Sequence, residues 1–265
     1  MISNKFNFLL SITLLIAVLS FMPLALADPN GAKVVNGTSS SAAVDSTPDG
    51  NNAIAGNVTE LTISGTVTTQ AWQGYFGNVS GVVRLANSAG QAMYNWTQAS
   101  PQGEVYASTN STVYWTNIQC FNFTAVGDYT SETGNGGTTS LYGTNLTQLQ
   151  AQYGITAGDA DTVNGTFNLI GAGTHDAFFT ASQDFAEGEC QSTRVYDDTG
   201  AGVANKFEEV LLYEPDSASV VFASLLEQDA DGFDAGTHDF EMLVLENGHG
   251  VDVASTPYYF FVELQ

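Results

Sequence analysis

Acidic side chains cluster near the C-terminus, and their type and spacing suit cation binding. Between Glu227 and Glu241 the chain carries six carboxylates, with Gly232 and Gly236 among them. Ca²⁺ takes about six to eight hard oxygen ligands, which a carboxylate-rich loop supplies. The pattern departs from an EF-hand, because Phe233 stands where a third ligand belongs and Phe240 occupies the twelfth position. A solvated acidic turn is the alternative to a calcium loop, whose candidate ligands are Asp229, Asp231, Asp234 and Asp239.

Other residues with catalytic potential form no recognisable motif. The three histidines, His175, His238 and His249, do not share one element at the spacing of zinc ligands. No nucleophile elbow and no phosphate-binding loop occurs. A pair of carboxylates could serve glycoside hydrolysis, but sequence spacing does not reveal a pair. The glutamates available for one are Glu104, Glu132, Glu187, Glu189, Glu208 and Glu209. We therefore expect a protein that is not an enzyme, with a secreted hydrolase as an alternative.

Aromatic side chains crowd the N-terminal half. Exposed rings there could stack on sugars, whereas buried rings would fill a core, which is their usual place in β-proteins. We favour burial and keep sugar binding as the alternative. The residues concerned are Trp72, Tyr75, Phe76, Trp96 and Trp115.

The first 27 residues resemble a secretory signal peptide. Lys5 precedes a long apolar run that ends in Ala25-Leu26-Ala27, small residues at the positions that a signal peptidase reads. Retention of this run as a membrane anchor is the alternative. After cleavage we expect no membrane span and an extracellular or cell-surface location.

The cysteines and the sequons fit that compartment. In an exported chain, an even count of two cysteines indicates a Cys120–Cys190 disulfide, with a catalytic thiol as the rival interpretation. Asn-x-Ser/Thr sequons are acceptors for N-glycosylation, although the same residues are also common in turns. They occur at Asn36, Asn57, Asn78, Asn95, Asn110, Asn122, Asn145 and Asn164.

A formal net charge of −23, with only five Lys plus Arg, limits the partners. Such a surface repels phosphates, so we expect no nucleic acid partner. It attracts cations, and Ca²⁺ is the one cofactor that the sequence suggests. The expected partners are copies of the same subunit, other envelope proteins, or glycans.

Short apolar alternations separated by turn residues predict an all-β fold. We expect an antiparallel β-sandwich, either one large or two small Ig-like domains, with a barrel as the alternative. One helix is predicted over 145–153. The predicted organisation is a signal peptide (1–27), a flexible Gly/Ser/Asn-rich arm (28–57), an N-terminal β-sandwich region with the disulfide (58–200) and a C-terminal β region of the same or a second domain (201–265).

Strands are predicted along most of the mature chain. The first begins at Val58, and one long strand is expected over 113–123. The others lie near 79–85, 91–97, 104–107, 166–170, 177–180, 190–196, 208–213, 219–226, 240–246 and 258–264.

Four segments resemble parts of archaeal secreted surface proteins. They are residues 72–81, 100–106, 117–120 and 258–264. The resemblance implies a β architecture at the cell envelope and carries over no catalytic residues. With the composition, it leads us to expect a secreted, N-glycosylated structural or assembly protein of an envelope, sheath or filament. The alternatives are an adhesion or carbohydrate-binding module and a secreted glycoside hydrolase.

Overall fold

This computed structural model describes residues 28–35, 37–42, 48–98, 102–123, 145–248 and 255–264. The predicted signal peptide and the sequon at Asn36 lie outside these residues, as do Glu132 and His249. Among the described residues, no helix has the length and apolar character needed to cross a membrane.

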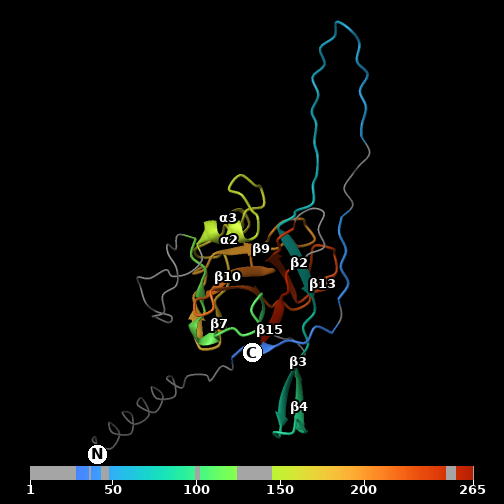
Figure 1. Cartoon of the computed structure of the whole chain (residues 1–265). Helices are drawn as coiled ribbons and strands as arrows, with labels where there is room; N and C mark the ends of the chain where they lie inside the picture. Colours follow the sequence, from blue (N-terminus) through green and yellow to red (C-terminus); the bar gives the residue numbers. More distant parts are fainter. Residues whose placement is uncertain are drawn as a thin grey trace, which may run out of the picture.

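A seven-stranded antiparallel sheet forms the centre of the molecule (Figure 1). Its strands follow the order β1-β15-β5-β11-β10-β6. The strands β6 and β9 share one edge of β10, with β9 pairing near the start of β10 and β6 near its end. Their bounds are β1 (Asn30–Gly31), β5 (Gly103–Ser108), β6 (Gln119–Cys120), β9 (Ser192–Arg194), β10 (Glu208–Glu214), β11 (Ser219–Leu225) and β15 (Tyr259–Leu264).

Both faces of this sheet are buried, so its central strands are apolar without clear alternation. All seven residues of β10 are buried. Leu211 and Tyr213 point into one hydrophobic core, whereas Val210 and Leu212 point into a second core on the opposite face. Successive side chains of a strand alternate between faces, which is why one strand serves both cores.

Different elements cover the two faces. The first core lies under α2 (Leu146–Gln152), α3 (Val163–Thr166) and the two-stranded sheet of β2 (Trp72–Gly77) and β14 (Phe240–Leu245). The second core lies under residues 113–118 and the hairpin of β7 (Phe178–Thr180) and β8 (Gln183–Phe185). A disulfide joins Cys120 to Cys190 beside this second core, with Cα atoms 5.1 Å apart. The predicted disulfide is therefore confirmed.

The helix predicted over 145–153 is present as α2. Asn145 caps it: its side chain accepts a hydrogen bond from the Gln148 amide, and the Gln148 side chain accepts one from the Asn145 amide. Leu149 and Tyr153 turn into the first core, as their spacing predicts. The strand predicted near 166–170 does not form: α3 ends at Thr166, and Leu169 makes only an isolated bridge to Ser192.

Two parts of the chain extend away from these layers (Figure 1). The hairpin of β3 (Gly81–Ala86) and β4 (Ala92–Gln98), predicted from its turn, projects at one end. Residues 48–70 form a long extended loop at the other end. A further two-stranded sheet pairs β12 (Ala230–Asp231) with β13 (Thr237–His238).

Two further strand predictions are wrong. Residues 58–67 form no strand, and Val58, Ile63 and Val67 are almost fully exposed. The strand expected over 113–123 is interrupted by a 3-10 helix, η1 (Trp115–Asn117). That turn changes the side-chain parity, so Trp115 enters the second core and Phe121 the first.

The all-β class is confirmed, since the strands pair antiparallel and the helices are short. The described strands form one large sheet and several two-stranded sheets, of which β2–β14 and β7–β8 cover its two faces. The Ig-like sandwich therefore stays a prediction.

Candidate functional site

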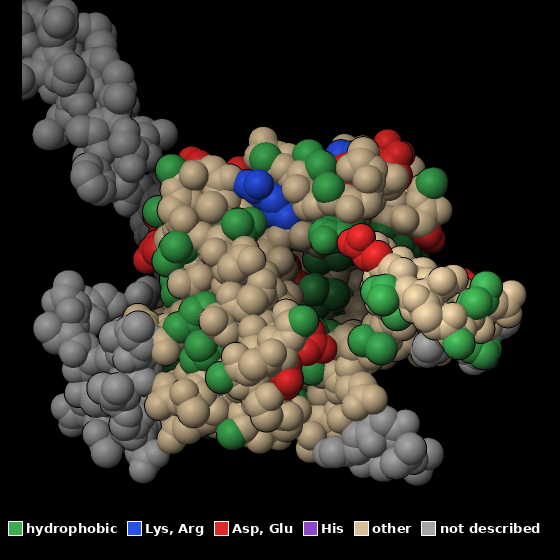
Figure 2. All heavy atoms as spheres, turned by 90° about the horizontal axis from the view of Figure 1, so that it is seen from above, with side chains coloured by type: hydrophobic (Ala, Val, Ile, Leu, Met, Phe, Trp, Pro, Cys, Tyr) green, Lys and Arg blue, Asp and Glu red, His purple; other side chains and the backbone are tan. Residues whose placement is uncertain are grey.

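A groove of about 1070 Å³ opens between the β2–β14 sheet and the segment that carries β9. Its volume lies just above the range of most small-molecule sites, about 300–1,000 Å³. Seen from above, the surface is hollowed and hydrophobic side chains line the hollow (Figure 2). Met242 and Leu243 of β14 contribute to the lining, with Thr166 and Asn168 on the side of α3.

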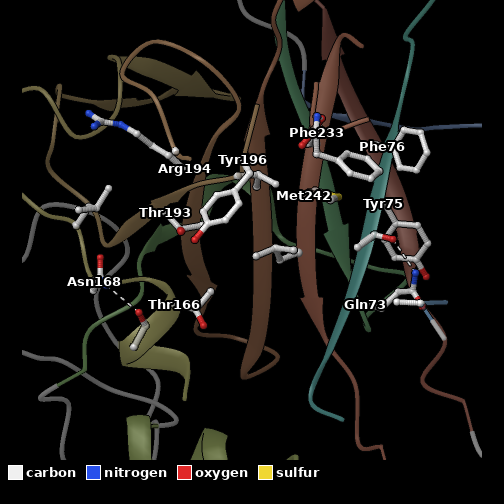
Figure 3. Close-up of a pocket in the computed structure, with 18 of the residues that line it drawn as sticks. Gln73, Tyr75, Phe76, Thr166, Asn168, Thr193, Arg194, Tyr196, Phe233 and Met242 are labelled. Carbon is white, nitrogen blue, oxygen red and sulfur yellow. Dashed lines mark hydrogen bonds between the residues drawn. The ribbon is translucent and has the colours of Figure 1, made fainter. Parts of the chain in front are cut away.

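Exposed aromatic rings stand on both sides of the groove (Figure 3). Tyr196 is 59% exposed on the β9 side, and Phe233 (52%) and Phe76 (50%) face it from the β2 side. The Phe76 and Phe233 rings meet edge to face, with centroids 5.0 Å apart. Gln73 and Arg194 also line the groove. Rings that flank polar side chains can bind a ligand with both apolar faces and hydroxyl groups.

The acidic loop before β14 holds Phe233 in place. Glu241 is buried at the groove, and one of its carboxyl oxygens accepts a hydrogen bond from the Phe233 amide at 3.0 Å. Burial raises the pKa of Glu241. His238 packs its ring on Phe76 and bonds Asp234 at 2.8 Å. The loop is thus ordered by its own carboxylates.

The predicted calcium ligands bond groups of the loop itself or lie apart from one another. Asp239 accepts hydrogen bonds from the Val79 and Asp229 amides through its two different oxygens. Asp234 bonds His238 and the Gly236 amide, and Asp231 pairs through its backbone with Thr237. Within the described ranges, no group of three or more His, Cys, Asp or Glu side chains is placed to hold a metal ion. Calcium at Asp229, Asp231, Asp234 and Asp239 stays a prediction, without an assembled site.

The aromatic residues named from the sequence separate into two groups. Trp115 is buried against Tyr106 and Phe261, and Trp72 packs on the first core and donates its indole N–H to the Asp161 carbonyl. Tyr75 packs on the first core and also lines the groove. Phe76 and Trp96 are exposed. The sequence did not single out Tyr196 or Phe233 as binding residues, because Tyr196 ends a predicted strand and Phe233 is an isolated aromatic in a polar loop.

Two glutamates face each other, but inside the protein. Glu104 of β5 and Glu263 of β15 are direct cross-strand neighbours and are 3% and 5% exposed. The Tyr106 hydroxyl lies 3.4 Å from Glu104 and 3.3 Å from Glu263. Burial, with the charge of Glu263, raises the pKa of Glu104 to about 8. This pair is enclosed, unlike the open pair that a glycosidase offers to a substrate.

The remaining candidate acids and histidines have structural partners. Glu187, Glu189, Glu208 and Glu209 each accept hydrogen bonds from backbone amides. His175 is buried and accepts a bond from the Cys190 amide at 3.0 Å. These contacts stabilise loops and layers and bring no two of these groups together at the groove.

A second surface of interest is the projecting β3–β4 hairpin. Its register pairs Val83 with Trp96 and Leu85 with Tyr94, so these four side chains share one face. Each is between 50% and 59% exposed, and the Tyr94 and Trp96 rings lie 4.9 Å apart. The opposite face carries Arg84 beside Asn95. The opposite face also carries Val82, which is 55% exposed, so the hairpin gathers its aromatic rings on one face but has exposed apolar side chains on both.

The described sequons lie on the surface to different degrees. The exposed sequon asparagines are Asn57, Asn78, Asn95 and Asn164. The half-buried ones are Asn110, Asn122 and Asn145. Asn145 uses its side-chain oxygen to cap α2, and Asn110 donates to the Thr112 carbonyl and the Ser217 hydroxyl. The four accessible positions are therefore the better acceptors for a sugar.

Comparisons with family models, with curated proteins and with solved structures found no match for this chain. The resemblance to archaeal secreted surface proteins accordingly stays a prediction.

Proposed function

We propose that this protein is an exported, N-glycosylated structural subunit that assembles with copies of itself at the cell surface. The N-terminal run of 27 residues and the accessible sequons support export. The Cys120–Cys190 disulfide supports an oxidising compartment.

The observation that carries the proposal is the uncovered apolar face of the β3–β4 hairpin. A two-stranded hairpin is at best marginally stable alone in water. Exposed apolar patches usually mark sites of association. The hairpin presents Val83, Leu85, Tyr94 and Trp96 on one face, where each remains at least half exposed among the described residues. A partner that covers this face would stabilise the hairpin and bury these side chains.

The charge distribution favours assembly through this part of the chain. Residues 50–103 carry only two charged side chains, Glu60 and Arg84, so the net charge of −23 lies outside them. Neutral surfaces can approach without the repulsion that separates the acidic bodies. Divalent cations, including Ca²⁺, would screen or bridge the acidic bodies in an assembled structure.

Electron microscopy of the exported, purified protein tests the proposal. We expect filaments or sheets at neutral pH, and more of them with millimolar Ca²⁺. Immunogold labelling of intact cells should place the protein in a layer or filament at the surface. A protein that remains monomeric at high concentration with and without Ca²⁺, and that labels no surface structure, would refute it.

A carbohydrate-binding module is the second candidate, favoured by the aromatic rings on both sides of the groove. Sugar rings stack on aromatic side chains while their hydroxyls bond polar groups. Binding on a glycan array that is lost in Phe233→Ala and Tyr196→Ala would support this function. The control is Tyr259→Ala, because Tyr259 is exposed on β15 and lies outside the groove lining. Binding unchanged in both groove variants would reject the groove as the site.

A further inference from the structure

Residues 59–68 have the pattern of an amphipathic strand but no strand partner. Leu61, Ile63 and Val67 share one parity, and Glu60 belongs to the other with Thr and Ser. The three apolar side chains are 54%, 86% and 87% exposed, and the segment forms no strand or helix in the described chain. An extended segment of this kind leaves its backbone groups open to a sheet edge.

The β3–β4 hairpin has the complementary features. Its two strands pair only with each other among the described strands, so each has an open edge. Its apolar face holds Val83 and Trp96, and the opposite face holds Arg84, the Asn95 sequon and the exposed Val82. A sugar on Asn95 would therefore leave the apolar face free.

Charge and polarity match between the two elements. A strand placed beside β3 with Leu61 on the apolar face puts Glu60 on the face of Arg84. These are the only charged residues between positions 50 and 103, and they are opposite in sign. Opposite charges on neighbouring strands stabilise their pairing, and like charges destabilise it.

The two elements lie at opposite ends of one rigid strand. The segment precedes β2 (Trp72–Gly77), and the hairpin begins four residues after it. Figure 1 shows the extended loop and the hairpin at opposite ends of the molecule. A contact between such ends of successive copies is heterologous and repeats along a line.

We propose that residues 59–68 of one copy add as a third strand to the β3 edge of the hairpin of the next copy, linking subunits head to tail. This inference rests on the proposed assembly function and names the contact that carries it. In the joint, Leu61, Ile63 and Val67 extend the apolar face around Trp96, and Glu60 lies beside Arg84.

A charge exchange in full-length exported protein tests the contact in trans. Glu60→Arg and Arg84→Glu each place like charges in the joint, so each alone should raise the concentration for half-assembly roughly two- to fivefold. An equal mixture of the two variants should assemble like the wild type, because each segment then meets a hairpin of opposite charge. Pairing within one copy would gain nothing from mixing.

The matched control is Asp49→Arg, which makes the same charge change on an exposed residue outside the segment. It should not weaken assembly. Trp96 gives an independent readout: its fluorescence should shift to shorter wavelength on assembly, and Trp96→Phe should remove the shift.

The outcomes separate the two proposals. Assembly of the wild type that is insensitive to both charge variants, or single variants that mixing does not rescue, overturns the strand contact and leaves the assembly function standing. Failure of the wild type to assemble refutes both.

Discussion

Replacing Glu104 by glutamine is expected to stabilise the protein at alkaline pH and to change little at acidic pH. Glu104 lies in the central sheet, buried beside Glu263 and Tyr106. Burial and the charge of Glu263 raise the pKa of Glu104 from 4.5 to about 8, so the folded protein holds this carboxyl protonated at neutral pH. Glutamine has nearly the same shape, but it cannot ionise.

The sign and size follow from proton linkage. The unfolded chain releases the Glu104 proton near pH 4.5 and the folded chain near pH 8. The stability contributed by the bound proton is therefore complete below pH 4.5 and is lost as the pH rises to about 8. At about 1.4 kcal/mol for each pKa unit, the loss is up to about 5 kcal/mol. The Glu104→Gln variant escapes this loss.

Urea unfolding of both proteins at pH 4.5 and pH 8.5 measures the effect. The difference in free energy of unfolding, variant minus wild type, should be near zero at pH 4.5 and should grow by several kcal/mol at pH 8.5. Glu60→Gln is the control, because Glu60 is exposed and its replacement should give no such pH dependence. A variant whose advantage is the same at both pH values would show that Glu104 is not held protonated in the folded protein.

Three further predictions concern stability and binding. Cys120→Ala with Cys190→Ala should lower the free energy of unfolding by about 4 kcal/mol, because the disulfide closes a loop across 70 residues; calorimetry measures it. Trp115→Ala should lower the free energy of unfolding by about 3–5 kcal/mol, because its ring is buried in the second core. Trp96→Ala should leave the stability of the monomer nearly unchanged and should weaken assembly, as measured by sedimentation. Phe233→Ala should leave the melting temperature within about 2 °C and lower any affinity for glycans, as measured by calorimetric titration.

The sequence predicts the elements whose local pattern agrees with their packing. The hairpin around residues 86–90, the helix capped by Asn145, and the apolar strands β10 and β11 all follow from turn residues and periodicity. The disulfide follows from the predicted export of the chain and from its even number of cysteines. These features need no knowledge of the neighbours in space.

The groove could not be predicted in the same way. Its β2 wall, Trp72–Gly77, contains two glycines that weaken the strand pattern, and its pairing with β14 spans more than 160 residues. Phe233 and Tyr196 line the same groove only because β14 packs on one face of the main sheet, in which β9 is an edge strand. Sequence spacing carries no information about such long-range contacts.

The failed prediction at residues 58–67 has a different cause. The local pattern is that of a strand, yet none of the described strands pairs with it. Natural sequences usually agree with their fold at every level, and disagreements concentrate at functional sites. Here the disagreement falls in the one long stretch without net charge, which also contains the uncovered hairpin. Pairing between copies accounts for these observations together. It gives residues 59–68 a partner strand and gives the β3–β4 hairpin a third strand. It also joins two elements that do not repel each other.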